Sequence, residues 1–184
     1  ACSTMAEALG LGSILIDGGY ADKVVCSTSS HFSSSERQYR FPLEQGGQRP
    51  LYSQWTVTGA GATVLAVTGE GPRVTYITTG RVMDFGIRDA NNMGAAMAPA
   101  VADTIIAHLK DTGRPATYYD LIVTGDLAKV GMDITNELVK TKGYNIESVY
   151  NDCGSIIFDN EKQDTHSGGS GCGCSAVVLN GYLL

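Results

Sequence analysis

The first stretch of the chain, "ACSTMAEALGLGSILIDGGYADKVV", restricts the fold more than any other because it orders a helix, a turn and a strand. Apolar residues recur at helical spacing from Ser3 to Asp17 and others fill the opposite face, which predicts a helix buried nearly all round. Gly18 and Gly19 end it, because glycine accepts a left-handed backbone conformation. The buried strand that follows completes the second half of a β-α-β unit.

The rest of the chain alternates between segments of strand type and helix type. We expect strands in three stretches, "TVTGAGATVLAV", "RVTYITTGRVM" and "YYDLIVTGDL". We expect helices in two, "AVADTIIAHLK", with Pro99 at its start, and "DITNELVKTKG". The stretch "HFSSSERQYRFPLEQGGQRPLYSQW" is expected to be a long polar loop of the kind that carries function. This alternation predicts an α/β fold with a mostly parallel sheet.

Composition argues against several classes of function. The net charge of −6 and the scattering of the 13 Lys and Arg residues argue against a nucleic-acid surface, which needs clustered basic side chains. No apolar run approaches the roughly 18 residues that cross a bilayer. The five cysteines are an odd number in a chain of 184 residues, so we expect reduced thiols. Cys172 and Cys174 lack the C-x-x-C spacing of a zinc site, and no metal site is expected.

Cys2 lies at the head of the first expected helix, where unpaired N–H groups and the positive end of the helix dipole favour a thiolate. The position therefore predicts a lowered pKa and a nucleophilic sulfur. Acyl transfer by such a thiol also needs a basic side chain and hydrogen-bond donors for the carbonyl oxygen. The alternative interpretation is a buried cysteine that serves only as a small hydrophobic residue.

Several stretches of the chain carry a resemblance to known proteins. The opening segment resembles the nucleophile helix of thiolases and ketoacyl-ACP synthases, in which Ala-Cys begins a buried helix. A narrower resemblance rests on "TSSHFSSSERQYRFPLEQGGQRP", "TVTGAGATVL", "DFGI", "NNMGAAMAPAVADTI", "YYDLIVTGDL" and "GGSGCGCSAVV". Together these stretches, which cover nearly the whole chain, are similar to the stage V sporulation protein AD family of spore-forming bacteria.

The resemblance implies a thiolase-like fold of two similar halves with a layered α-β-α arrangement. Residues 1–80 would form the rest of the N-terminal half, starting at the nucleophile-type helix, and residues 81–184 a truncated C-terminal half. The resemblance further implies that the fold is incomplete in this chain. The segment before the nucleophile-type helix and the end of the C-terminal half are expected to be missing.

The positions that match the catalytic partners of condensing enzymes carry other residues here. Condensing enzymes of this fold have His in a His-Gln-Ala-Asn stretch after a strand, and the matching stretch here contains Asp126 and no imidazole. Thiolases have another His in a Gly-His-Pro stretch after a Gly-Gly pair, where this chain has Cys172. The resemblance therefore implies that the cysteine remains while its proton-handling partners are gone.

By this resemblance the protein is expected to be no enzyme. It would bind dipicolinic acid (pyridine-2,6-dicarboxylate) and support its uptake into the developing spore. Two alternatives stay open. One is a thiolase or ketoacyl synthase-type acyltransferase in which Cys2 is the nucleophile and the catalytic residue. The other is a scaffold of the spore membrane transport complex that binds no ligand.

A flat aromatic dianion needs bidentate donors for its two carboxylates, together with backbone N–H groups and apolar walls. No cofactor is expected, and whether calcium accompanies dipicolinate stays open. Asp126 is the candidate carboxylate for that calcium. The candidate ligand-binding residues are Cys2, Ser3, His31, Arg37, Arg40, Asp126 and Cys172.

The resemblance also implies partners and a location. The protein would work beside other stage V sporulation A proteins, peripheral to the inner membrane of the forespore or spore. The full-length protein would be a homodimer. The chain itself predicts no nucleic-acid partner and no transmembrane segment.

Overall fold

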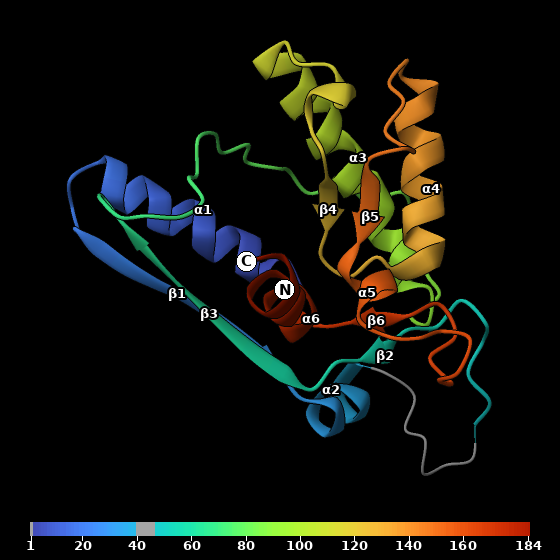
Figure 1. Ribbon diagram of the computed structural model, residues 1–184. Helices are drawn as coiled ribbons and strands as arrows, with labels where there is room; N and C mark the ends of the chain where they lie inside the picture. The colour runs from blue at the N-terminus through green and yellow to red at the C-terminus, as the bar shows by residue number, and fades with distance from the viewer. Residues whose placement is uncertain (1, 40–46) are drawn as a thin grey trace.

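The computed structural model describes residues 2–39 and 47–184, and for residues 36–39 it describes the backbone alone. Helices and strands alternate along the described chain, and its strands form three two-stranded sheets (Figure 1). The α/β fold class expected from the sequence is confirmed. The division into residues 1–80 and 81–184 stays a prediction.

One unit combines segments from both ends of the described chain. Its elements are α1 (Thr4–Asp17), β1 (Lys23–Ser30), β3 (Gly59–Ala66), α6 (Cys172–Val178) and the π-helical turn η3 (Leu179–Leu183). β1 and β3 pair antiparallel, and α1 and α6 pack on their sheet around the buried Met5, Cys26 and Ala176 (Figure 1). A Cβ at Gly61 of β3 would lie 2.5 Å from the carbonyl oxygen of Ala176, so only glycine permits this approach. The packing brings the first turn of α6 to the first turn of α1.

The second unit contains the middle of the chain. Its elements are α3 (Met93–Thr112), the 3-10 turn η2 (Ala116–Tyr118), β4 (Ile122–Thr124), α4 (Ala128–Thr141), β5 (Tyr150–Asp152) and α5 (Cys153–Ile156). β4 and β5 pair in parallel, and Leu109, Val139 and Ile146 lie in the core between the helices and this sheet. α3 and α4 approach closely because Gly94 and Gly131 face each other: a Cβ at Gly131 would lie 2.8 Å from the Gly94 carbonyl oxygen.

A short parallel pair of strands connects the two units. β2 (Trp55–Thr56) pairs with β6 (Gly169–Ser170), and the pairing continues where Val57 N donates to Ser170 O at 2.9 Å. β6 leads directly into α6, so the position of α6 depends on this pair. α2 (Phe32–Tyr39) follows β1, and Phe32 stacks on Trp55 with ring centroids 4.8 Å apart.

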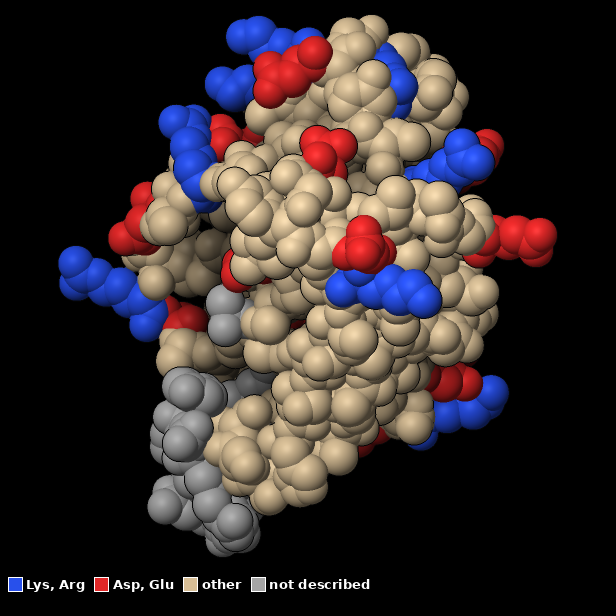
Figure 2. Space-filling view, turned by 90° about the vertical axis from the view of Figure 1, so that its left-hand side faces the viewer, with Lys and Arg blue, Asp and Glu red and all other residues tan. Residues whose placement is uncertain are grey.

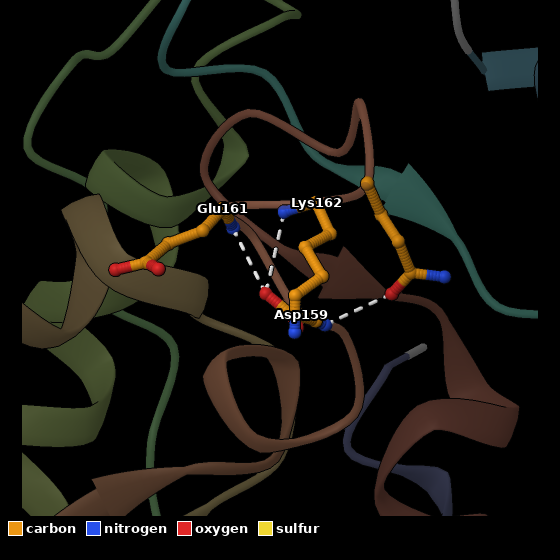
Figure 3. Close-up of polar contacts among 4 residues, drawn as sticks. Asp159, Glu161 and Lys162 are labelled. Carbon is orange, nitrogen blue, oxygen red and sulfur yellow. Dashed lines mark hydrogen bonds and ion pairs between the residues drawn. The ribbon is translucent and has the colours of Figure 1, made fainter.

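The loop between α5 and β6, residues 157–168, is fixed by its own polar groups. Asp159 is the centre of these contacts, and its carboxylate accepts from the Lys162 ammonium at 2.9 Å and from the Glu161 backbone N–H at 3.2 Å (Figure 3). Further along, the Arg49 guanidinium donates to the carbonyl oxygen of Asp164 at 2.7 Å. The loop thereby returns the chain to β6 next to β2.

The helix expected from Ser3 to Asp17 is confirmed as α1, but its expected burial is wrong. Met5 and Gly12 are buried, whereas Leu11 and Ile14 on the opposite face are 61% and 53% exposed. The β1–β3 sheet and α6 together cover one face of the helix. Apolar residues all round a helix predict burial only where a second layer covers the other face.

The strand expected in "RVTYITTGRVM" is wrong. The segment has no hydrogen-bonded strand partner among residues 2–39 and 47–184, and a strand forms only with one. Side chains hold it against the second unit instead. Thr78 hydrogen-bonds His108 at 2.7 Å, Arg81 pairs with Asp103 at 2.7 Å, and Arg114 lies over the Tyr76 ring.

Two expected helix starts are wrong by several residues. α3 begins at Met93, where the Asn92 side chain accepts from Ala95 N at 3.2 Å, and Pro99 lies inside the helix rather than at its start. α4 begins at Ala128, well before Asp133, the first residue of "DITNELVKTKG", because a side chain from β5 caps it. The C-terminal ends of α3 and α4 agree with the expectation. α3 ends before Gly113, which adopts a left-handed φ of 66°.

Two expectations about loops and sheets also need correction. The long polar stretch after β1 begins with a helix, α2, and ends at the first residue of β2, so it is not a loop throughout. The sheet expected to be mostly parallel is three separate pairs, of which β1–β3, with eight residues in each strand, is antiparallel. Two short pairs, β2–β6 and β4–β5, are parallel.

The surface on the side of α1 and β1 carries Lys and Arg interspersed with Asp and Glu, together with a broad area without charged side chains (Figure 2). On this face the basic side chains are dispersed rather than gathered into one patch. No helix in the described part of the chain is long and apolar enough to span a membrane.

Candidate functional site

Cys2 lies two residues before the start of α1, next to its N-cap Ser3, and is half-buried. Its thiol donates a hydrogen bond to the carboxylate of Asp126, and burial together with this carboxylate raises the pKa of Cys2 to about 12. The expected lowering of the Cys2 pKa is therefore wrong. Desolvation of the thiolate and the adjacent anion outweigh the helix N-terminus, which acts on the charge only through its first turn.

Asp126 lies in the β4–α4 connection, residues 125–127, and is buried with 4% of its surface exposed. Its Oδ2 atom accepts from Gly171 N at 3.0 Å, and its backbone carbonyl accepts from Gln54 Nε2 at 2.8 Å. The carboxylate thus joins the start of α1 to the start of α6. Gly171 has a φ of 106°, which a side chain rarely tolerates, so glycine is what lets its N–H reach Asp126.

Cys172 is the first residue of α6 and is half-buried. The Thr4 hydroxyl lies 3.9 Å from Cys172 Sγ and donates towards it. Cys172 is close enough to Cys2 that its charge contributes to the raised pKa of Cys2. Cys2, Asp126 and Cys172, which lie far apart in the sequence, therefore form one cluster, which we call the Cys2 site.

Two more cysteines lie behind this cluster. Cys153 and Cys174 are fully buried, and burial is the largest cause that raises the pKa of each, to about 12 for Cys153. Asp126 raises the pKa of both thiols further. The thiols of Cys2, Cys153 and Cys174 are therefore protonated at neutral pH, and Cys2 is present as an S–H group rather than as a nucleophilic thiolate.

Asp152 lies at the end of β5 with no exposed surface. Burial is the largest influence on its carboxyl, and although hydrogen bonds from Thr124, Leu127 and Ala128 favour the charged form, the pKa rises from 3.8 to about 6. The nearby Asp126 charge adds to this rise. The Asp126 and Asp152 carboxyls therefore lie near each other in a region largely excluded from water.

The remaining expected ligand residues are not brought into this cluster. Ser3 is exposed, and its hydroxyl bonds the Glu7 carboxylate. His31 is exposed and its ring bonds the Ser33 hydroxyl at 2.9 Å, although Ser30 beside it does reach Gly173 N of α6 at 2.9 Å. The Arg37 side chain and the whole of Arg40 lie outside the described residues.

All three histidines have partners away from the Cys2 site. His31 bonds Ser33, His108 bonds Thr78 and Tyr119 at 2.7 Å each, and His166 lies 3.1 Å from Asp164. None of these contacts includes Cys2. Within the described part of the chain, no group of three or more His, Cys, Asp or Glu side chains is arranged to hold a metal ion by itself.

The site contains residues that the sequence did not indicate. Gln54 and Asp152 are both buried, and both hold the β4–α4 connection that carries Asp126. Asp152 had one usable signal: an Asp directly before a short apolar segment that begins at Cys153 is a typical helix N-cap. Gln54 had none, because its role depends on β2 lying beside β6. A separate shallow depression lies over α4, lined by residues such as Asn136 and Glu137, and contains no expected site residue.

The comparisons with known proteins agree on one family. A family model described as stage V sporulation protein AD (SpoVAD) matches residues 1–184. The chain is 47% identical over 184 residues to the stage V sporulation protein AD of Bacillus subtilis (strain 168). All of the chain is covered by that match, and the chain spans 54% of the length of that relative. The chain therefore belongs to the stage V sporulation protein AD family.

Proposed function

We propose that the protein binds dipicolinate at the Cys2 site and supports its uptake into the developing spore without catalysing a reaction. The observation that carries this proposal is the hydrogen bond from the Cys2 thiol to the buried Asp126. An acyltransferase needs a base that removes the proton of the thiol, so that the sulfur becomes a reactive thiolate. A buried carboxylate next to the thiol favours the protonated sulfur instead.

The groups of the Cys2 site suit a small polar ligand better than a covalent acyl intermediate. The thiols of Cys2 and Cys172 supply soft, weakly polar walls, and the Thr4 hydroxyl can turn from Cys172 towards a ligand. The backbone N–H groups at the first turn of α1 supply donors for an anion. Arg37 and Arg40 stay candidate partners of the ligand carboxylates.

Asp126 sets a condition on how a dicarboxylate can bind. Two carboxylates cannot lie in contact in a buried region unless a proton or a cation lies between them. We infer that dipicolinate enters either with its calcium ion, which Asp126 would help to hold, or with uptake of one proton. Asp126 would then be the residue that makes affinity depend on calcium.

Equilibrium titration of dipicolinate into the purified protein, with and without calcium, tests the proposal. The Asp126→Asn variant is expected to bind the calcium chelate more weakly and the calcium-free dianion more tightly than the unchanged protein. Cys26→Ala is the matched control, because Cys26 is buried in the core beside Met5 and Ala176. If dipicolinate binds saturably and Asp126→Asn changes its affinity in neither titration, the ligand does not bind at this site.

The same experiment separates the other two functions. A protein that is folded and binds no dipicolinate would support the scaffold alternative. The acyltransferase alternative predicts a covalent adduct on Cys2 after incubation with acyl-CoA, which intact-mass spectrometry detects. We expect no adduct.

We further propose that the protein acts as a homodimer, peripheral to the inner membrane of the forespore or spore and beside other stage V sporulation A proteins. Family membership and the exposed apolar surface of α1 and β1 support this proposal, since Leu11 and Val25 are each more than half exposed. Sedimentation of the purified protein tests the dimer. Fractionation of sporulating cells, with and without a high-salt wash, tests the peripheral location.

A further inference from the structure

The β4–α4 connection, which carries Asp126, is held from its buried side by one carboxylate. Asp152 Oδ2 accepts from the Thr124 hydroxyl at 2.6 Å and from Leu127 N at 3.0 Å. Asp152 Oδ1 accepts from Ala128 N at 2.7 Å and from Gly154 N at 2.9 Å. Three of these donors lie before, within and after the connection, the fourth is Gly154 N of α5, and all converge on a side chain with no exposed surface.

The backbone at the end of this connection is held in an unusual conformation. Ala128 has a φ of 54°, a left-handed conformation that is unfavourable by about 1–2 kcal/mol for a residue other than glycine. Its N–H makes the 2.7 Å bond to Asp152, which compensates for this backbone conformation. Without that bond the connection would relax to a commoner conformation, and Asp126 would move with it.

The other side of the same connection faces the Cys2 site. Asp126 accepts from Gly171 N and from the Cys2 thiol, and Gln54 holds its backbone carbonyl. Asp152 makes none of these contacts itself. It lies behind the connection, and its effect on the thiol of Cys2 must pass through Asp126.

We propose that Asp152 is a positioning residue of the Cys2 site, whose carboxylate fixes the β4–α4 connection and so sets where Asp126 meets Cys2 and Gly171. The proposal concerns the same site as the proposed dipicolinate binding. Its biological role rests on that proposed function, whereas the positioning itself does not. Its geometry, and the test below, involve no ligand. Asp152→Asn is the sharpest change, because either orientation of the amide turns an NH2 group towards two of the four donors.

The reporter is the rate at which iodoacetamide alkylates Cys2, measured by mass spectrometry of the Cys2 peptide at pH 8. The rate follows the thiolate fraction, so it rises about tenfold for each unit by which the pKa of Cys2 falls. Displacing Asp126 removes its hydrogen bond and its charge from the thiol. We therefore expect Asp152→Asn and Asp126→Asn each to raise the Cys2 alkylation rate by roughly an order of magnitude.

A double variant shows whether Asp152 acts through Asp126. If it does, adding Asp152→Asn to Asp126→Asn changes the Cys2 rate no further, because the group through which Asp152 acts is already gone. A second rise of similar size in the double variant would show that the two residues act independently, and this would overturn the proposal. An unchanged Cys2 rate in the single Asp152→Asn variant would overturn it as well.

Cys26 reports on general loosening of the protein in the same sample. It is buried and its thiol donates to Ala8 O at 3.1 Å, away from Asp126. A rise for Cys2 with no rise for Cys26 is the expected result. If Asp152→Asn unfolds the protein and exposes both, Thr124→Val decides, since it removes one of the four donors. A smaller rise at Cys2 alone supports the proposal, and no change at Cys2 contradicts it.

Dipicolinate titration of the same variants separates this inference from the proposed function. Asp152→Asn is expected to change affinity in the same direction as Asp126→Asn if both proposals are correct. Altered Cys2 alkylation in a protein that binds no dipicolinate would uphold the positioning role and reject the ligand. Unaltered Cys2 alkylation in Asp152→Asn, in a protein that binds dipicolinate, would reject the positioning role and uphold the proposed ligand.

Discussion

Asp152 and Asp159, on either side of α5, are both acceptors of several hydrogen bonds, yet their carboxyls are affected in opposite directions. Asp152 has no exposed surface and accepts only from uncharged donors, and its pKa rises to about 6. Asp159 lies in the exposed loop, and its bond with the Lys162 ammonium is the main cause that lowers its pKa (Figure 3).

The difference shows which effect is larger at each position. Hydrogen bonds to a carboxylate favour its charged form, but four of them do not compensate Asp152 for complete removal from water. The Asp159 carboxylate stays in contact with water, so its bond with one cation, Lys162, is enough to favour its charged form. The Cys2 site is built in the first kind of surroundings, and burial together with the adjacent Asp126 explains why the thiol of Cys2 is protonated.

Removing the two carboxylates should give the largest contrast. Asp152→Ala leaves four donors without an acceptor in a region without water, and we expect the free energy of unfolding to fall by about 3 kcal/mol or more. Asp159→Ala leaves its donors to water, and we expect little change. Urea unfolding of both variants measures the difference. Equal losses would mean that burial does not distinguish the two residues.

The pH dependence of stability should also differ between the two. The folded-state pKa of Asp152 is above its ordinary value, so its contribution is fully present below pH 3.8 and is lost as the pH rises through about 6. The loss amounts to about 3 kcal/mol over this range, from about 1.4 kcal/mol for each pKa unit. The lowered pKa of Asp159 has the opposite sign, and its contribution is lost on acidification.

Urea unfolding between pH 4 and pH 7 measures this dependence, and Asp152→Asn is the variant that isolates it. The unfolding free energy of the unchanged protein minus that of this variant should fall steadily as the pH rises from 4 to about 6 and level off above that pH. A constant difference would show that Asp152 titrates with an ordinary pKa.

The thiol of Cys2 extends the comparison from carboxylates to cysteine. Its raised pKa of about 12 means that its alkylation rate should keep rising about tenfold per pH unit through pH 10. A rate that levels off by pH 9 would show an ordinary or lowered pKa and would favour the nucleophile. The reaction with iodoacetamide, followed on the Cys2 peptide, measures the profile.

The smallest effect is expected at the exposed pair. Lys162→Ala removes the cation from Asp159, so the pKa of Asp159 should return towards its ordinary value, as NMR titration of the carboxyl would show. The free energy of unfolding should stay unchanged, because exposed ion pairs contribute little. A clear loss of stability would mean that the α5–β6 loop depends on this pair.

Local sequence patterns predicted the parts of the fold that depend on local physics. The helix at residues 3–17 follows from apolar spacing, and the end of α3 follows from the left-handed Gly113. "RVTYITTGRVM" has strand composition, but a strand also needs a partner, and composition carries no information about one. The start of α4 was missed for the same reason, since its cap, Asp152, comes from β5.

The candidate site was predicted in part. Cys2, Asp126 and Cys172 were found because each matches a motif position of the family, and the structure brings these three together. Ser3 and His31 were expected from neighbouring positions and have other partners. The direction of the Cys2 pKa could not be predicted, because it depends on Asp126, which lies far away in the sequence.

Calorimetric titration of dipicolinate into the purified protein and its Cys2→Ala variant, in the same calcium-containing buffer, tests the central claim most directly. The account predicts saturable binding that is lost or strongly weakened in Cys2→Ala and kept in Cys26→Ala. Equal affinity in all three proteins, or no binding to a protein shown to be folded, would contradict it.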